Sequence, residues 1–128
     1  MSKETQQTYL ERAHDVRRRA RIGAEVQREI VSSNILHGDV PLPNGPGSPM
    51  FALLRDQQRA ATDRLAAEGN LTHASILMEE VYEALAELPT DGTSTENDAA
   101  LRAELVQASA MCQKWIADID RRRDDGAV

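Results

Sequence analysis

Aromatic residues are scarce in this chain of 128 residues: one tryptophan, two tyrosines and one phenylalanine make up 3% of it, although 41% of the residues are hydrophobic. A hydrophobic core must therefore consist mainly of alanine, leucine, isoleucine, valine and methionine. Strands favour aromatic and β-branched residues, whereas alanine and leucine favour helices. The composition therefore predicts an all-α fold, and the chain length is that of one compact helical bundle.

Cysteine is rare and long hydrophobic runs are missing. The single cysteine, Cys112, excludes an intramolecular disulfide and is typical of a protein from a reducing compartment. No apolar run approaches the about 20 residues of a transmembrane helix. Residues 1–7 are polar and contain no apolar segment of a signal peptide. We therefore expect a cytoplasmic protein with no contact to a membrane.

An excess of basic charge is absent as well, because the formal net charge is −6. Tight, sequence-independent binding to nucleic acid requires a basic surface, so we expect no nucleic-acid partner. One basic run consists of the arginines at positions 17–19, followed by Arg21. We interpret it as a solvated helix face that pairs with Glu11, Asp15 and Glu25, and a phosphate or nucleic-acid contact is the alternative.

Apolar residues recur at three- and four-residue spacing in four segments, which is typical of helices with one buried face. These segments cover residues 4–35, 49–68, 73–88 and 97–122. Ser48 and Thr72 stand directly before the second and third segments and are the predicted N-caps. The pattern therefore predicts a bundle of about four to five helices, since the first segment is long enough to be divided.

Gly23 lies in the middle of the first segment and marks a candidate break in that helix. A break there would separate an N-terminal helical arm, residues 1–23, from a domain that covers residues 24–123. Residues 124–128 are then a flexible tail. Residues 37–49 are rich in glycine and proline and form a loop that is long enough to cover a ligand.

Glutamates concentrate on the last two predicted helices. Glu79, Glu80 and Glu83 lie beside the apolar stripe of the third, and Glu104 falls inside the apolar stripe of the fourth. A carboxylate at such a position needs a compensating charge, either an arginine or a bound metal ion. If Glu104 packs against Glu80 and Glu83, three carboxylates converge and favour Mg²⁺ or Mn²⁺. The remaining alternative is that the glutamates form only a solvated face.

This pair of acidic helices resembles the MazG-like all-α nucleotide pyrophosphohydrolases, most closely their short actinobacterial and phage branch. The resemblance extends over about residues 24–120 and rests on residues 72–87, 101–107 and 115–116. The family signature is Glu-Glu-x-x-Glu followed by Glu-x-x-Asp. Glu79, Glu80 and Glu83 match its first part and Glu104 begins the second, but Gln107 stands where the family has aspartate.

The resemblance implies that the chain hydrolyses a nucleoside triphosphate to the monophosphate and pyrophosphate, with Mg²⁺ or Mn²⁺ as cofactor. Carried over position by position, Glu80, Glu83, Glu104 and Gln107 would be metal ligands. Glu79 would be a further ligand or the base for the attacking water. Gln107 brings an amide oxygen without charge, which keeps open the alternative of a catalytically attenuated module that binds a nucleotide or a protein.

Three further residues are candidates for contact with the substrate. Lys114 lies two turns beyond Gln107 and would bind the leaving pyrophosphate. His37, in the glycine-proline loop, would contact the base, and Trp115 is either a core residue or a platform for the nucleobase. Related proteins dimerise, so the resemblance also implies a homo-oligomer, either a dimer or a dimer of dimers.

Overall fold

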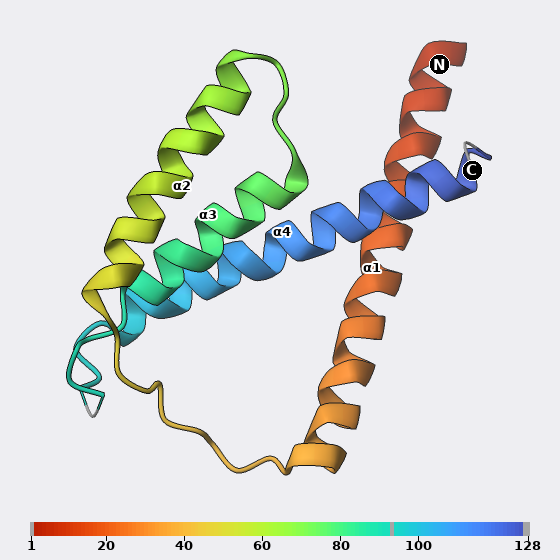
Figure 1. The fold of residues 1–128 in the computed structure, drawn as a ribbon. Coiled ribbons are helices and arrows are strands. Elements are labelled where there is room, and N and C mark those ends of the chain that lie inside the picture. The colour runs from red at the N-terminus through yellow and green to blue at the C-terminus, as the bar shows by residue number, and fades with distance from the viewer. Residues whose placement is uncertain (1, 93, 127–128) are drawn as a thin grey trace. The chain divides into compact units, whose positions relative to one another are not determined.

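The structure is a computed structural model, and it describes residues 2–92 and 94–126. All regular elements among these residues are helices (Figure 1). They are α1 (Lys3–His37), α2 (Pro49–Ala67), α3 (His73–Ala86) and α4 (Asp98–Asp124). The predicted all-α fold with four helices is therefore confirmed. None of the helices combines the length and the hydropathy that crossing a membrane would need, as far as the chain is described.

The helices begin where local sequence signals place them. The side chain of Ser48 accepts a hydrogen bond from the backbone N–H of Met50, and Pro49 occupies the first turn of α2. Thr72 and Ser75 form a capping box, in which each side chain accepts a hydrogen bond from the backbone N–H of the other residue. Both predicted N-caps are therefore confirmed.

Helix α1 continues without interruption through Gly23, so the candidate break at this glycine is wrong. A glycine inside a helix lowers its stability by only about 1 kcal/mol, which the neighbouring turns outweigh. The proposed limits of an arm at residues 1–23 and a domain at residues 24–123 stay a prediction. Within the predicted tail, Ala127 and Val128 lie outside the described residues.

The chain divides into two compact units. The first unit comprises Met1–Val40 and Gln113–Val128, and the second comprises Pro41–Cys112. Helix α4 contributes to both, its N-terminal part to the second unit and its C-terminal part to the first.

Two helix contacts build the second unit. Helix α2 packs on α3, where Thr62 Oγ1 and Gln58 Nε2 both donate hydrogen bonds to the backbone oxygen of Ser75, at 3.3 and 3.4 Å. Helix α3 and the first part of α4 run antiparallel (Figure 1), and Asn97 Nδ2 donates to the backbone oxygen of Glu87 at 2.9 Å. The two acidic helices are therefore neighbours, as the sequence predicts.

The loop before α2 is fastened to the connection between α3 and α4. The backbone N–H of Gly47 donates to the oxygen of Pro89 at 2.7 Å, and Asn44 Nδ2 donates to Asp98 Oδ1 at 2.8 Å. A Cβ atom at Gly47 would collide with the carbonyl group of Leu88. The two backbones approach each other this closely only because position 47 has no side chain.

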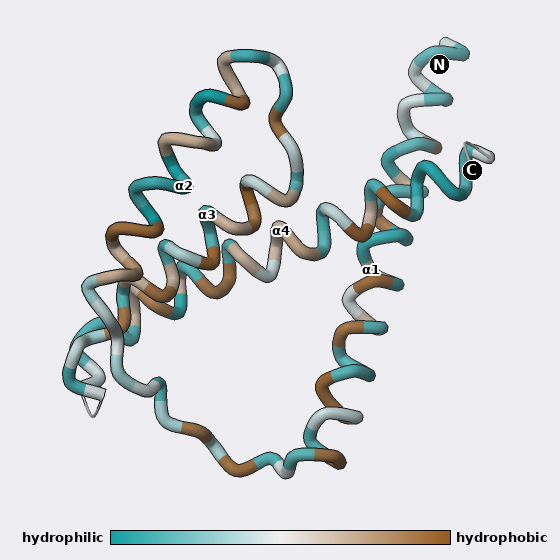
Figure 2. Tube along the Cα trace, viewed as in Figure 1, coloured by the Kyte–Doolittle hydropathy of each residue, from teal (hydrophilic) through white to brown (hydrophobic). Residues whose placement is uncertain are grey.

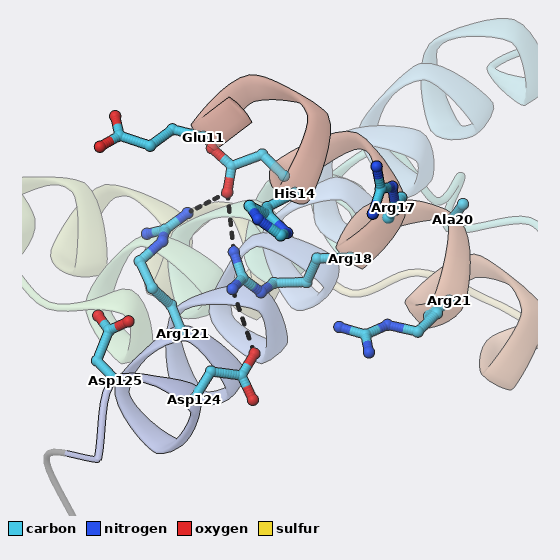
Figure 3. Close-up of a pocket in the computed structure, with 10 residues that line it drawn as sticks. Glu11, His14, Arg17, Arg18, Ala20, Arg21, Arg121, Asp124 and Asp125 are labelled. Atoms are coloured by element: carbon cyan, nitrogen blue, oxygen red, sulfur yellow. Dashed lines mark hydrogen bonds and ion pairs between the residues drawn. The ribbon is translucent and has the colours of Figure 1, made fainter. Parts of the chain in front are cut away.

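An ion-pair network holds α1 to the C-terminal part of α4 in the first unit (Figure 3). Arg18 donates to Asp15 Oδ1 at 2.8 Å and to Asp124 Oδ2 at 3.3 Å. Arg121 donates to Asp118 Oδ1 at 2.7 Å and to Asp15 Oδ1 at 3.4 Å. Asp15 is thus shared by two guanidinium groups that come from different helices.

This network corrects part of the interpretation of the arginine run. The pairing with Asp15 is confirmed, but Arg18 is buried rather than solvated, with 10% of its side chain exposed. Basic and acidic side chains together line a pocket of about 1010 Å³ at this junction. The charged residues among them are Arg17, Arg18, Arg21, Arg121, Glu11, Asp15, Asp124 and Asp125. Four positive and four negative groups balance one another, so these side chains give the pocket no formal net charge.

Candidate metal centre

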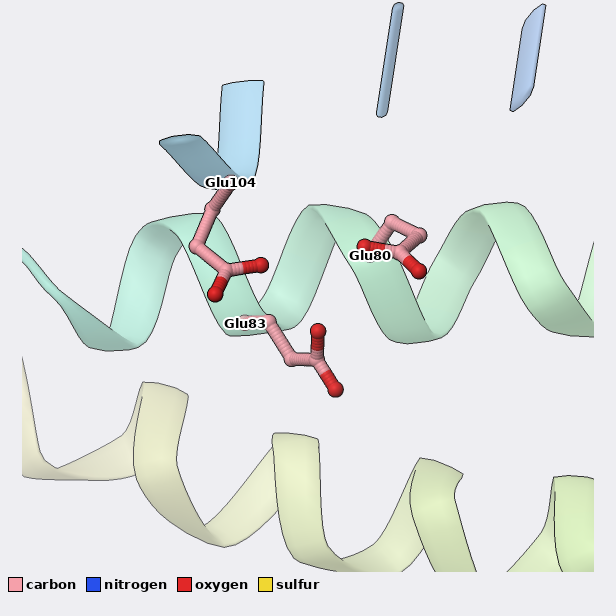
Figure 4. Close-up of side chains that lie close together, drawn as sticks. All are labelled: Glu80, Glu83 and Glu104. Atoms are coloured by element: carbon pink, nitrogen blue, oxygen red, sulfur yellow. The ribbon is translucent and has the colours of Figure 1, made fainter. Parts of the chain in front are cut away.

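Three carboxylates converge between α3 and α4 (Figure 4). Glu80, Glu83 and Glu104 each contribute one oxygen atom, and these oxygens all lie within 4.8 Å of one another. Glu80 and Glu83 share a helix face because they are three residues apart. Glu104 reaches them from the antiparallel helix α4. All three side chains are half-buried, and we call them the carboxylate triad. Their predicted convergence is confirmed.

Two oxygens of the carboxylate triad are covered and unsatisfied. Glu80 Oε2 and Glu104 Oε2 are shielded from solvent and have no hydrogen-bond partner within the described residues. A covered carboxylate oxygen without a donor is costly, because it has lost water and gained nothing in exchange. A cation held between the helices would satisfy both atoms. An all-oxygen set of donors fits a hard divalent cation such as Mg²⁺ or Mn²⁺.

Burial and mutual repulsion act on the carboxylate triad in the same direction. The pKa of Glu80 is raised above the ordinary value of 4.5. Burial is the largest cause, and the negative charges of Glu83 and Glu104 raise it further. Burial, followed by the charge of Glu83, likewise raises the pKa of Glu104. The protein alone therefore disfavours the ionised form of the triad, and a positive charge at this place would reverse that preference.

A pH dependence of stability follows from these pKa directions. Glu80 and Glu104 bind protons more tightly in the folded than in the unfolded chain, so they favour folding most below the unfolded value near 4.5. In the presence of a chelator, the free energy of unfolding is expected to fall as pH rises from 4.5 through the raised pKa values. Denaturant titrations at several pH values measure this, and Glu80→Gln should weaken the decline. A decline of equal size in this variant would contradict the assignment.

Among the described residues, Arg59 of α2 is the arginine that forms ion pairs with glutamates of α3. Its Nη2 donates to Glu83 Oε1 at 3.1 Å, and its Nε lies 3.6 Å from Glu79 Oε1. Sequence reasoning missed Arg59. The signal available was that three neighbouring glutamates on α3 need a counter-charge, and α2 carries three arginines, Arg55, Arg59 and Arg64. Only the packing register selects Arg59.

The other predicted site residues are not members of the carboxylate triad. Glu79 is not part of the carboxylate triad and instead lies beside Arg59. Gln107 is exposed, one turn after Glu104 on α4. Lys114, Trp115 and His37 belong to the first unit, where Lys114 and His37 are exposed and Trp115 is half-buried. Their roles toward a substrate stay predictions.

Comparisons with protein families, with curated proteins and with solved structures find no match for this chain. What the structure supports of the resemblance is an all-α protein of four helices, with a carboxylate triad that could hold a metal ion.

Proposed function

We propose that this chain is a Mg²⁺-dependent nucleoside triphosphate pyrophosphohydrolase of the MazG-like kind, with Mn²⁺ as a possible substitute. The observation that carries the proposal is the carboxylate triad with its two covered, unpartnered oxygens. Burying such oxygens next to like charges costs free energy unless a proton or a cation compensates them, and a cation does so while the carboxylates stay ionised. Divalent cations of this class serve most often to bind phosphate groups and to activate water at them.

Glu80, Glu83 and Glu104 would hold the cation. Gln107 would be a fourth ligand, because in antiparallel helices one turn back from Glu83 to Glu80 corresponds to one turn forward from Glu104 to Gln107. An amide oxygen can ligate Mg²⁺ but adds no negative charge. Once bound, the cation would neutralise charge on the phosphate oxygens and lower the pKa of a nearby water.

Glu79 would accept the proton of the attacking water, since it stands next to the carboxylate triad in sequence without being one of its members. The water oxygen attacks the α-phosphorus, the bond from that phosphorus to the bridging oxygen breaks, and pyrophosphate leaves with the electron pair. The resemblance alone assigns the leaving pyrophosphate to Lys114 and the nucleobase to His37 and Trp115, and these three roles stay predictions.

Pyrophosphate release from a panel of canonical and modified nucleoside triphosphates tests the proposal. Release is expected with Mg²⁺ or Mn²⁺, and both a chelator and the double substitution Glu80→Gln/Glu83→Gln should abolish it. Circular dichroism shows whether the variant keeps its helices. Release that persists in the variant would overturn the role of the carboxylate triad. No release from any substrate, although the protein binds the cation, would favour the attenuated binding module that Gln107 suggests.

We also propose that the chain forms a homo-oligomer, a dimer or a dimer of dimers. The C-terminal half of α1 carries apolar side chains that remain exposed, Ile30, Val31, Ile35 and Leu36 among them, and brown segments alternate with teal ones along this stretch in Figure 2. A face of this kind marks an interaction site, because apolar surface favours burial. A second copy of α1 offers the same apolar face. Sedimentation equilibrium that showed only a monomer at every concentration would contradict this.

A further inference from the structure

Glu83 takes part in two interactions that a bound cation would bring into competition. It is a member of the carboxylate triad, and its Oε1 also accepts a hydrogen bond from Arg59 Nη2 at 3.1 Å. Arg59 reaches Glu79 with its Nε at 3.6 Å, so the guanidinium bridges two glutamates one turn apart on α3. Of the three triad members, Glu83 is the one that this arginine engages.

The two sides of this ion pair differ in their freedom to move. Glu79 and Glu83 are 19% exposed, whereas 48% of the Arg59 side chain is exposed. The guanidinium can therefore leave Glu83 by rotating its long side chain into solvent, without any change in the packing of α2 on α3. Glu79 and the carboxylate triad together carry four negative charges when all are ionised, and Arg59 neutralises only one of them. The site thus retains the charge to attract a divalent cation while Arg59 is in place.

We propose that Arg59 is an internal counter-ion, which occupies Glu83 in the absence of the divalent cation and turns to the phosphate groups of the substrate when the cation is bound. This inference rests on the proposed function. A guanidinium and a cation compete for the carboxylate group of Glu83, because each is repelled by the charge of the other. The released guanidinium presents several N–H donors in one plane, a geometry that matches phosphate oxygens.

The two binding events are coupled as a consequence. Cation binding frees the guanidinium for an anion, so pyrophosphate should bind more tightly in the presence of the cation than a simple sum predicts. Removal of Arg59 should separate the effects: the cation gains a site without a competitor, and the anion loses a donor. A residue that merely stabilises the contact between α2 and α3 would produce neither change.

Arg59→Gln tests this, with Arg55→Gln as the matched control one turn away on the same helix. Arg55 pairs with Asp56 at 3.1 Å and with none of the glutamates of α3 among the described residues. Mn²⁺ is titrated first without any anion, and inorganic pyrophosphate is then titrated at saturating Mn²⁺. Arg59→Gln should bind Mn²⁺ about tenfold more tightly and pyrophosphate about tenfold more weakly than the wild type. Arg55→Gln should match the wild type, and Arg59→Lys should restore Mn²⁺ affinity to near the wild-type value.

The outcomes separate this inference from the proposed function. If the wild type binds Mn²⁺ and Arg59→Gln binds it equally or more weakly, Arg59 is no competitor and the inference is overturned, while the metal centre stands. Unchanged affinity for pyrophosphate in Arg59→Gln would overturn the second half of the inference. If neither protein binds Mn²⁺, the proposed function fails and the inference fails with it.

Discussion

We expect that addition of Mg²⁺ or Mn²⁺ raises the melting temperature of the wild-type chain and that Glu104→Gln abolishes this increase. A ligand that binds only the folded state stabilises it by about 2.7 kcal/mol at a hundredfold excess over its dissociation constant. For a chain of this length that corresponds to an increase of about 10 °C. Glu104 is the member of the carboxylate triad that comes from α4, so its loss would remove the proposed ligand from that helix.

The same variant is expected to behave in the opposite way without the cation. Glutamine at position 104 removes one of the like charges around Glu83, and the pKa of Glu104 is raised by burial first and then by that repulsion. Glu104→Gln should therefore melt at or above the wild-type temperature in a chelator near neutral pH. Glu68→Gln, at the exposed C-cap of α2, is the control and should follow the wild type under both conditions. An equal increase with Mg²⁺ in Glu104→Gln would exclude Glu104 as a ligand.

Gly47→Ala is expected to lower the free energy of unfolding by about 2–3 kcal/mol, the size of effect that follows when a methyl group is forced into a well-packed site. The added Cβ would collide with the carbonyl oxygen of Leu88 and lie 2.7 Å from its carbon. Both obstacles are backbone atoms that cannot rotate away. Relief requires the loop to move from the α3–α4 connection, which breaks the hydrogen bond from Gly47 N–H to the oxygen of Pro89.

Gly23→Ala is the matched control, because the same methyl group is added in the interior of α1. Apart from the adjacent residues and the neighbouring backbone of α1 itself, no atom lies within 4 Å of the Cβ position at Gly23. Alanine is a better helix former than glycine, so this variant should gain about 0.5–1 kcal/mol. Denaturant titration of both variants measures the two changes. A Gly47→Ala variant as stable as the wild type would show that the loop is not fastened to Leu88 and Pro89 as described.

Local signals explain why the helices could be predicted from the sequence. A periodic apolar pattern and a capping residue act within a few positions of each other, so Ser48 and Thr72 mark the starts of α2 and α3 without any knowledge of the tertiary structure. Glu80 and Glu83 lie on the same face of α3 because they are three residues apart, which the sequence alone shows. Gly23 shows the limit of such signals, since one weak position does not end a helix that its neighbours stabilise.

Contacts between residues far apart in the sequence could not be predicted, because they depend on the packing register of distant helices. Glu104 could have been compensated by an arginine or by a cation, and only the packing of α3 and α4 shows that it faces Glu83. Arg59 meets Glu83 across 24 positions, and Arg18 meets Asp124 across 106. Several arginines compete for each of these contacts in the sequence. Burial of Arg18 was not foreseeable for this reason, because a charge run is usually a solvated face.

A Mn²⁺ binding isotherm, recorded by calorimetry for the wild type and for Glu80→Gln/Glu83→Gln, tests the central claim most directly. We expect one saturable site per chain in the wild type, with Mg²⁺ as a competitor for it, and no saturable site in the variant. Absence of saturable binding in the wild type, or the same isotherm in both proteins, would contradict the metal centre. Glu80, Glu83 and Glu104 would then be half-buried glutamates whose charges only repel one another, and the proposed hydrolysis would lose its basis.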